Sequence, residues 1–60
     1  MNIVKVHLSP TQDGEIKPVY INLDNVCVIQ RLSVSTKILF IDGQAILVDE
    51  TPEEIAAKAN

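Results

Sequence analysis

The sequence is poor in the residues that build small rigid sites. Its 60 residues include one cysteine, two glycines, one tyrosine, one phenylalanine and no tryptophan. The single cysteine, Cys27, excludes an intramolecular disulfide and offers no ligand spacing for a structural zinc. Gly14 and Gly43 each follow an aspartate and are each explained by a turn. No glycine-rich loop is therefore present to hold a phosphate group.

Positive charge is also sparse and dispersed. The net charge is −3, and no two basic residues are adjacent. Proteins that bind nucleic acid concentrate lysine and arginine on one face, because neutralising phosphates supplies most of the affinity. They also stack bases on exposed aromatic rings, of which this chain has few. We therefore expect no nucleic-acid partner.

Long apolar runs are missing as well. The run at residues 38–41 is far too short to span a bilayer. The first residues, MNIVKVHLS, lack the basic segment and long apolar stretch of a signal peptide. With one free thiol and no export signal, we expect a cytoplasmic protein that does not insert into membranes.

Hydrophobic residues, mostly valine, isoleucine and leucine, make up 47% of the chain. Their alternation predicts one domain over residues 1–60 with an α+β, mostly β fold: about five short antiparallel strands and one short C-terminal helix. The sheet is expected to be curled or closed into a small barrel. We expect strands at about 2–8, 18–23, 26–32, 36–41 and 45–49, and a helix at about 52–59.

The stretch TKILFIDGQAILVDETPEEI, residues 36–55, gives the clearest local signals. The pair Asp42-Gly43 between two apolar runs predicts a two-residue type I′ hairpin loop. With a simple register, Ile38, Phe40, Ala45 and Leu47 would form one set of side chains, and Leu39, Ile41, Ile46 and Val48 the other.

The helix is expected to begin with a capping box. Thr51 can accept a hydrogen bond from the Glu54 backbone N–H, and the Glu54 side chain can accept one from the Thr51 N–H. Pro52 suits the first helical position, where its missing N–H costs nothing. Glu53 and Glu54 favour the positive end of the helix dipole.

Residues that could carry chemistry are isolated. His7 has no second histidine or cysteine near it in sequence, so we expect a strand residue at a surface or an interface. Cys27 lies in an apolar strand and is expected to behave as a small hydrophobe. We interpret the acidic group as a solvated face, since it lacks calcium-loop spacing; it comprises Asp49, Glu50, Glu53 and Glu54. No catalytic residue, metal ligand or cofactor is predicted, and we expect no enzyme.

Function must then depend on a surface. Both sets of side chains in the last two strands are apolar, and one short helix cannot cover both faces of a sheet. Either closure into a barrel or packing on another subunit would supply the missing cover, and we favour a homo-oligomer. The leading hypothesis is a small module that modulates a larger complex by docking on a protein partner of unknown identity. The interface candidates are Ile38, Leu39, Phe40, Ile41, Ile46 and Val48.

An alternative is a protein that binds or sequesters a small ligand, with a pocket between subunits. Such a protein could be phage-encoded. Arg31 is the one candidate clamp for an anion in that part of the chain. The candidate ligand-binding residues are Tyr20, Asn22, Gln30, Arg31, Ser33 and Ser35.

Residues 19–30 and 35–55 also resemble the small FlbD-like proteins associated with flagella and swarming motility. The resemblance lies in Ile21-Asn22, the apolar strand at 26–29, the Asp42-Gly43 hairpin and the pattern Val48-x-Glu50-Thr51-x-Glu53-Glu54-Ile55. It covers about the last two-thirds of the chain, and short phage-encoded proteins share the pattern. The resemblance implies a non-enzymatic accessory protein that acts through contacts with larger machinery, and it brings no catalytic residues.

Overall fold

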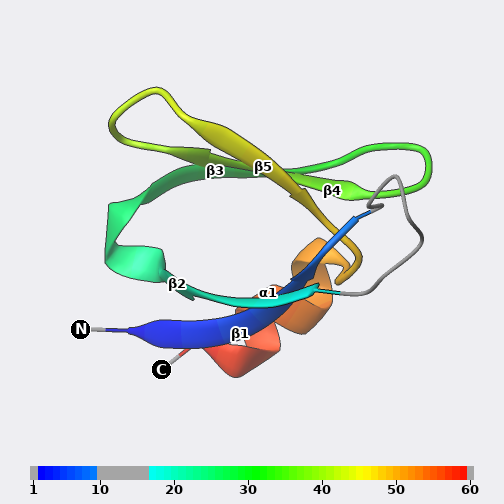
Figure 1. The fold of residues 1–60 in the computed structure, drawn as a ribbon, viewed down its shortest axis with the longest axis horizontal. Coiled ribbons are helices and arrows are strands. Elements are labelled where there is room, and N and C mark those ends of the chain that lie inside the picture. The colour runs from blue at the N-terminus through cyan, green and yellow to red at the C-terminus, as the bar shows by residue number, and fades with distance from the viewer. Residues whose placement is uncertain (1, 10–16, 60) are drawn as a thin grey trace.

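A computed structural model describes residues 2–9 and 17–59 of the chain. Within these residues the predicted fold class is confirmed: five antiparallel strands form one sheet, and one short helix follows (Figure 1). The loop predicted around Asp13 and Gly14 lies outside the described residues. Each strand and the helix α1 lie within one residue of their expected bounds, and a 3-10 helix that was not expected lies between the second and third strands. The elements are β1 (Ile3–Leu8), β2 (Lys17–Asn22), the 3-10 helix η1 (Leu23–Asn25), β3 (Val26–Arg31), β4 (Thr36–Phe40), β5 (Ala45–Val48) and α1 (Pro52–Lys58).

The sheet is curled but not closed. Its strand order is β2-β1-β5-β4-β3, which leaves β2 and β3 as the two edges. The two limbs, β1–β2 and β3–β4–β5, are joined through a short β1–β5 contact with one strand pair, Leu8 with Val48. Two backbone hydrogen bonds extend this contact, from Ser9 N to Leu47 O at 3.0 Å and from Asp49 N to His7 O at 2.9 Å. Of the two architectures expected, the structure has the curled open sheet.

The β4–β5 hairpin is not the type I′ turn that was predicted. That turn needs positive φ at both central residues, but Gly43 alone has a positive φ, at 92°. The loop is longer by one residue: Gly43 N donates to Phe40 O at 3.0 Å, and Phe40 N donates to Gln44 O at 2.8 Å. Asp42 Oδ1 accepts from Gln44 N at 3.0 Å and holds the turn.

The longer loop shifts the strand register by one residue, which moves every side chain of β5 to the opposite face. Ile38 pairs with Ile46, and Leu39 pairs with Ala45. The expected grouping of side chains is therefore wrong for β5. The inward set comprises Ile38, Phe40, Ile46 and Val48, and the outward set comprises Leu39, Ala45 and Leu47.

The core fills the concave side of the sheet, between the two limbs. Ile38, Val6 and Val48 are fully buried there, together with Ile55 from the helix. Because α1 has only seven residues, its docking depends on packing rather than on its own helix propensity. Ile55 supplies that packing, so α1 covers the inner side, and no element within residues 2–9 and 17–59 covers the outer side of β3–β4–β5.

The capping box predicted for α1 is confirmed. Thr51 Oγ1 accepts from Glu54 N at 3.1 Å, and Glu54 Oε1 accepts from Thr51 N at 3.1 Å. Pro52 occupies the first helical position as expected. These contacts fix the start of α1 and with it the direction in which Ile55 points.

Candidate functional site

The outer side of β3–β4–β5 carries a group of apolar side chains, here called the outer apolar face: Val28, Leu39, Ala45 and Leu47. Val28 lies opposite Leu39, and Leu39 lies opposite Ala45, so the three form one row across the strands. Leu47 lies in the next row, opposite Lys37. Val28 is 48% exposed and Leu47 is 40% exposed. Figure 1 shows β3, β4 and β5 along one side of the molecule and α1 beside β1 on the opposite side.

The structure divides the six interface candidates. Ile38 and Val48 are fully buried inside the chain and cannot contact a partner, which corrects their assignment to an interface. Phe40 and Ile46 are partly buried and pack against the same core. Leu39 is half-buried on the outer side, and Ile41, at the hairpin loop, is 66% exposed.

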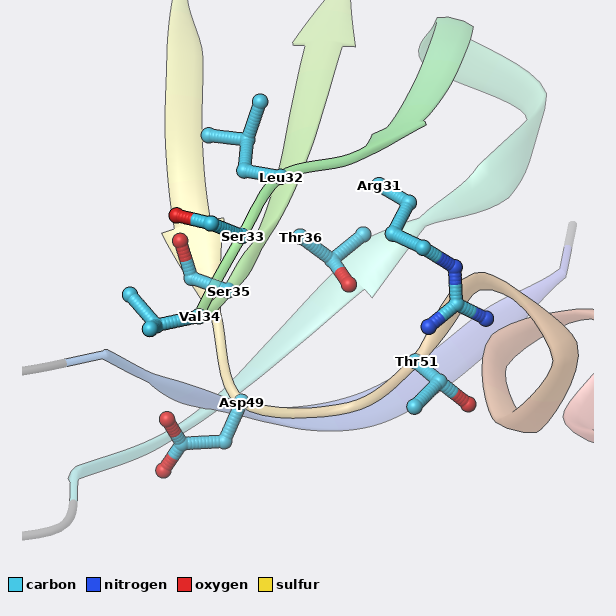
Figure 2. A pocket seen from close by; sticks show the side chains of 8 residues that line it. All are labelled: Arg31, Leu32, Ser33, Val34, Ser35, Thr36, Asp49 and Thr51. Atoms are coloured by element: carbon cyan, nitrogen blue, oxygen red, sulfur yellow. The ribbon is translucent and has the colours of Figure 1, made fainter.

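A second feature is an open hollow of about 180 Å³ beside the β3–β4 loop (Figure 2). It lies between that loop and the residues that lead from β5 into α1. The loop is held by a hydrogen bond from Leu32 N to Ser35 O at 2.8 Å. The polar lining residues are Arg31, Ser33, Ser35, Thr36, Asp49 and Thr51.

Three of the six ligand candidates, Arg31, Ser33 and Ser35, meet in this hollow. The other three do not line it: Tyr20 is on β2, Asn22 caps η1 and Gln30 is on β3. Arg31 is already engaged, because its guanidinium forms an ion pair with Glu53 at the start of α1. The Glu53 backbone N–H and the Arg31 side chain both lower the pKa of the Glu53 carboxyl.

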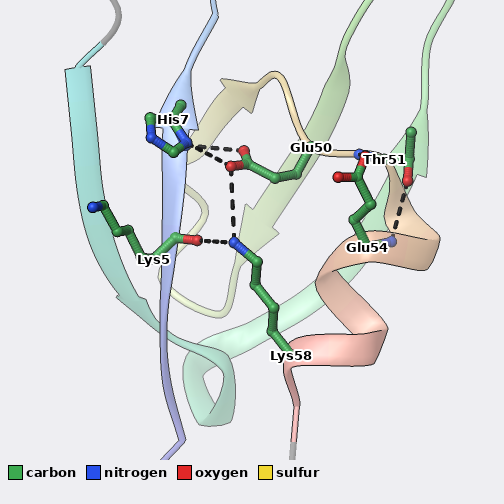
Figure 3. A network of polar contacts seen from close by, with 6 residues as sticks. All are labelled: Lys5, His7, Glu50, Thr51, Glu54 and Lys58. Carbon is green, nitrogen blue, oxygen red and sulfur yellow. Dashed lines mark hydrogen bonds and ion pairs between the residues drawn. The ribbon is translucent and has the colours of Figure 1, made fainter.

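Polar contacts between β1 and the C-terminal residues form a third feature (Figure 3). His7 Nδ1 lies 2.7 Å from Glu50 Oε2, and His7 N donates to Glu50 Oε1 at 2.9 Å. Lys58 Nζ lies 3.9 Å from Glu50 Oε2 and donates to Lys5 O at 2.7 Å. The network ties the end of α1 to β1.

Glu50 was expected on a solvated acidic face, but only 8% of the residue is exposed. Burial raises the pKa of its carboxyl, and hydrogen bonds from the His7 ring and backbone lower it; the net pKa lies below the ordinary value. Sequence reasoning missed this pair because its members are 43 residues apart. Only the β1–β5 pairing, which no local pattern specifies, brings them together.

The remaining candidates carry little chemistry. Cys27 is exposed, not buried as expected, and it lies where the β3–β4 register shifts between Val26 and Val28. A bulge places its extra residue outside the regular alternation of a strand, which explains the difference.

Among residues 2–9 and 17–59, no group of three or more His, Cys, Asp or Glu side chains could hold a metal ion. No helix in the same residues is long and apolar enough to cross a membrane.

The fold and these three features define a small β-rich domain with an apolar face that no other element of the described residues covers. No family model, curated protein or solved structure matches the chain. The function is therefore inferred from the surface of the protein.

Proposed function

We propose that the protein is a small non-enzymatic module that modulates a larger complex by docking on a protein partner, and that it works as a homo-oligomer. The observation that carries this proposal is the outer apolar face. A contiguous group of exposed apolar side chains on a small protein is typical of a protein-binding surface. The face lies on a three-stranded part of the sheet, so its shape is held by backbone pairing before any partner arrives.

Site-specific photo-crosslinking tests the surface in the living host. A photoreactive amino acid in place of Leu47 lies on the face, and one in place of Tyr20 provides a matched control. Tyr20 is 69% exposed but lies on β2, away from that face. We expect a discrete crosslinked protein from position 47 that is missing from position 20. Equal labelling from both positions would contradict the assignment of the surface.

A second candidate function, binding of a small polar ligand, draws on the hollow beside the β3–β4 loop. Arg31, Ser33 and Ser35 provide hydrogen-bond donors there, and Asp49 provides a carboxylate. In this hypothesis a second chain closes the open side of the hollow. Native mass spectrometry of protein purified from its host would reveal a bound mass. Arg31→Ala should remove that mass, while Lys5→Ala, at an exposed residue on β1 outside the hollow, should retain it. A wild-type spectrum that shows only the mass of the protein, with no bound ligand, would contradict this function.

A flagellar or swarming setting is a further part of the proposal and rests on the FlbD-like pattern alone. Deletion of the gene should then alter motility, and a variant with Leu39→Glu should fail to restore it. Normal motility after deletion would remove this setting and leave the docking proposal in place.

A further inference from the structure

The outer apolar face has opposite charges at its two ends. Lys37 stands on β4 two residues before Leu39, and Asp42 lies in the hairpin loop three residues beyond it. Lys37 projects from the outer side, because its neighbours Thr36 and Ile38 are both buried. Asp42 is exposed as well. Along β4 and its hairpin loop, the order is therefore a cation, apolar side chains and a carboxylate.

We propose that a second copy of this chain packs on this face, about a two-fold axis that lies between the two sheets and runs across the strands. The proposal rests on the proposed function, because it names a partner for the surface already assigned to protein binding. This axis reverses the strand direction in the second copy. The Lys37 end of each copy then lies over the Asp42 end of the other, which gives two symmetry-related ion pairs around an apolar centre.

The charges select this axis over the other face-to-face arrangement. A two-fold axis parallel to the strands would keep the strand ends in place and set Lys37 against Lys37 and Asp42 against Asp42. Like charges across an interface disfavour such a pairing. The axis across the strands brings opposite charges together and leaves Leu39, near the midpoint, in contact with the second copy.

The size of the face sets the strength of the dimer. Weak, reversible interfaces bury less than about 1,200 Å² in total, or about 600 Å² from each copy. The outer apolar face has four side chains, of which Val28 is 48% and Leu47 is 40% exposed, so it belongs to this weak class. We therefore expect a dimer that dissociates in the micromolar range, from which a larger partner can displace one copy.

Sedimentation of the purified protein from low micromolar to millimolar concentration tests the dimer. The weight-average mass should rise from 6.6 kDa towards twice that value. Leu39→Glu should remain folded by circular dichroism and stay monomeric. Tyr20→Glu, a substitution at a 69% exposed side chain on β2, away from the face, is the matched control and should dimerise as the parent does. A wild-type monomer at millimolar concentration, or a Leu39→Glu dimer, would overturn the proposal.

Charge exchange tests the axis. Lys37→Glu alone and Asp42→Lys alone should each weaken self-association about tenfold, because each leaves like charges facing. An equimolar mixture of the two variants should associate again, since both ion pairs of the heterodimer have opposite signs. If Asp42→Lys disturbs the loop, Asp42→Asn keeps the side-chain oxygen that accepts from Gln44 N, and it should weaken the dimer less. No recovery in a mixture of folded variants would exclude this axis.

The two proposals fail separately. A wild-type monomer that still gives a partner crosslink from position 47 would refute the dimer and leave the docking function standing. A dimer disrupted by Leu39→Glu, with self-crosslinks alone from position 47 in the host, would support the dimer and refute docking on a larger complex through this face.

Discussion

The Glu50 carboxylate accepts two hydrogen bonds from one residue, His7: one from the backbone N–H and one through the ring Nδ1, at 2.9 and 2.7 Å. The acceptor is almost fully buried, whereas a third of the histidine side chain, 34%, is exposed. Lys58, near the end of α1, approaches the same carboxylate. A loop residue therefore joins β1 to the helix, next to the short contact that links the two limbs of the sheet.

Removing the Glu50 charge should lower stability at neutral pH. Glu50→Gln keeps the size of the side chain but loses charge-assisted hydrogen bonds in a buried position, which costs about 1–3 kcal/mol of unfolding free energy. Urea denaturation at pH 7 measures the difference. Glu54→Gln is the control, because glutamine also completes a capping box. Equal losses in both variants would show that the His7–Glu50 pair contributes nothing specific.

The same pair should make stability depend on pH in the acid range. The folded-state pKa of Glu50 lies below its ordinary value of 4.5, so the unfolded chain binds more protons there. The stabilisation is complete above the unfolded pKa and is lost as pH falls through the folded one. The difference in unfolding free energy between wild type and Glu50→Gln should shrink as pH falls below about 4.5. A constant difference across that window would contradict the linkage.

The capping box should be measurable by itself. Thr51→Ala removes the oxygen that accepts from Glu54 N, and the loss of such a cap costs about 0.5–2 kcal/mol. Thr51→Ser retains a hydroxyl at the same position and should recover most of that stability. Identical denaturation midpoints for Thr51→Ala and its parent would show that α1 does not need the cap.

The hairpin register can be tested with two neighbouring residues. Ile46 faces the core and Leu47 faces out, so Ile46→Ala should cost about 2 kcal/mol or more. Leu47→Ala should cost well under about 1 kcal/mol when unfolding is measured below the concentration at which copies associate. In the register expected from a two-residue loop, Leu47 would face the core and Ile46 would face out. That register predicts the larger loss of stability for Leu47→Ala.

The fold was largely predictable from local patterns, and the register was not. Alternation located the strands, and the Thr51–Glu54 spacing located the helix start. Each of these signals involves only residues that are close together in the sequence. An Asp-Gly pair, however, suits a two-residue loop and also a three-residue loop with glycine at the last position. The choice depends on the core: the longer loop buries Ile46 and Val48 beside Ile38 and exposes Ala45 instead.

The candidate site was predictable only in part for the same reason. Arg31, Ser33 and Ser35 are close in sequence, and they do share the hollow. Val48 was assigned to an interface although it is buried, since one shifted residue exchanges the faces of β5. Ile38 on β4 was assigned there as well, because both faces of that strand are apolar and alternation does not tell which of them is buried. His7 and Glu50 meet through pairing of strands from opposite ends of the chain, which no spacing in the sequence encodes.

The conformation of Gly43 gives the last prediction. Its φ of 92° lies in a region that L-residues rarely adopt, and no atom lies within 4 Å of a Cβ built at this position. Gly43→Ala should therefore cost about 1 kcal/mol or more through backbone strain alone, without a steric clash. Gly43→Asn should cost less, because asparagine tolerates positive φ better than alanine.

A synthetic chain of this length allows a stricter comparison at the same position. D-alanine prefers positive φ and adds the same methyl group as L-alanine. The D-alanine form of the protein should therefore be more stable than the glycine form by about 0.4–1 kcal/mol, because the methyl group restricts the unfolded chain. Thermal or urea denaturation of the L-alanine, D-alanine and glycine forms measures this order. If L-alanine matches D-alanine, the hairpin does not hold Gly43 at positive φ, and the three-residue loop with its register would be wrong.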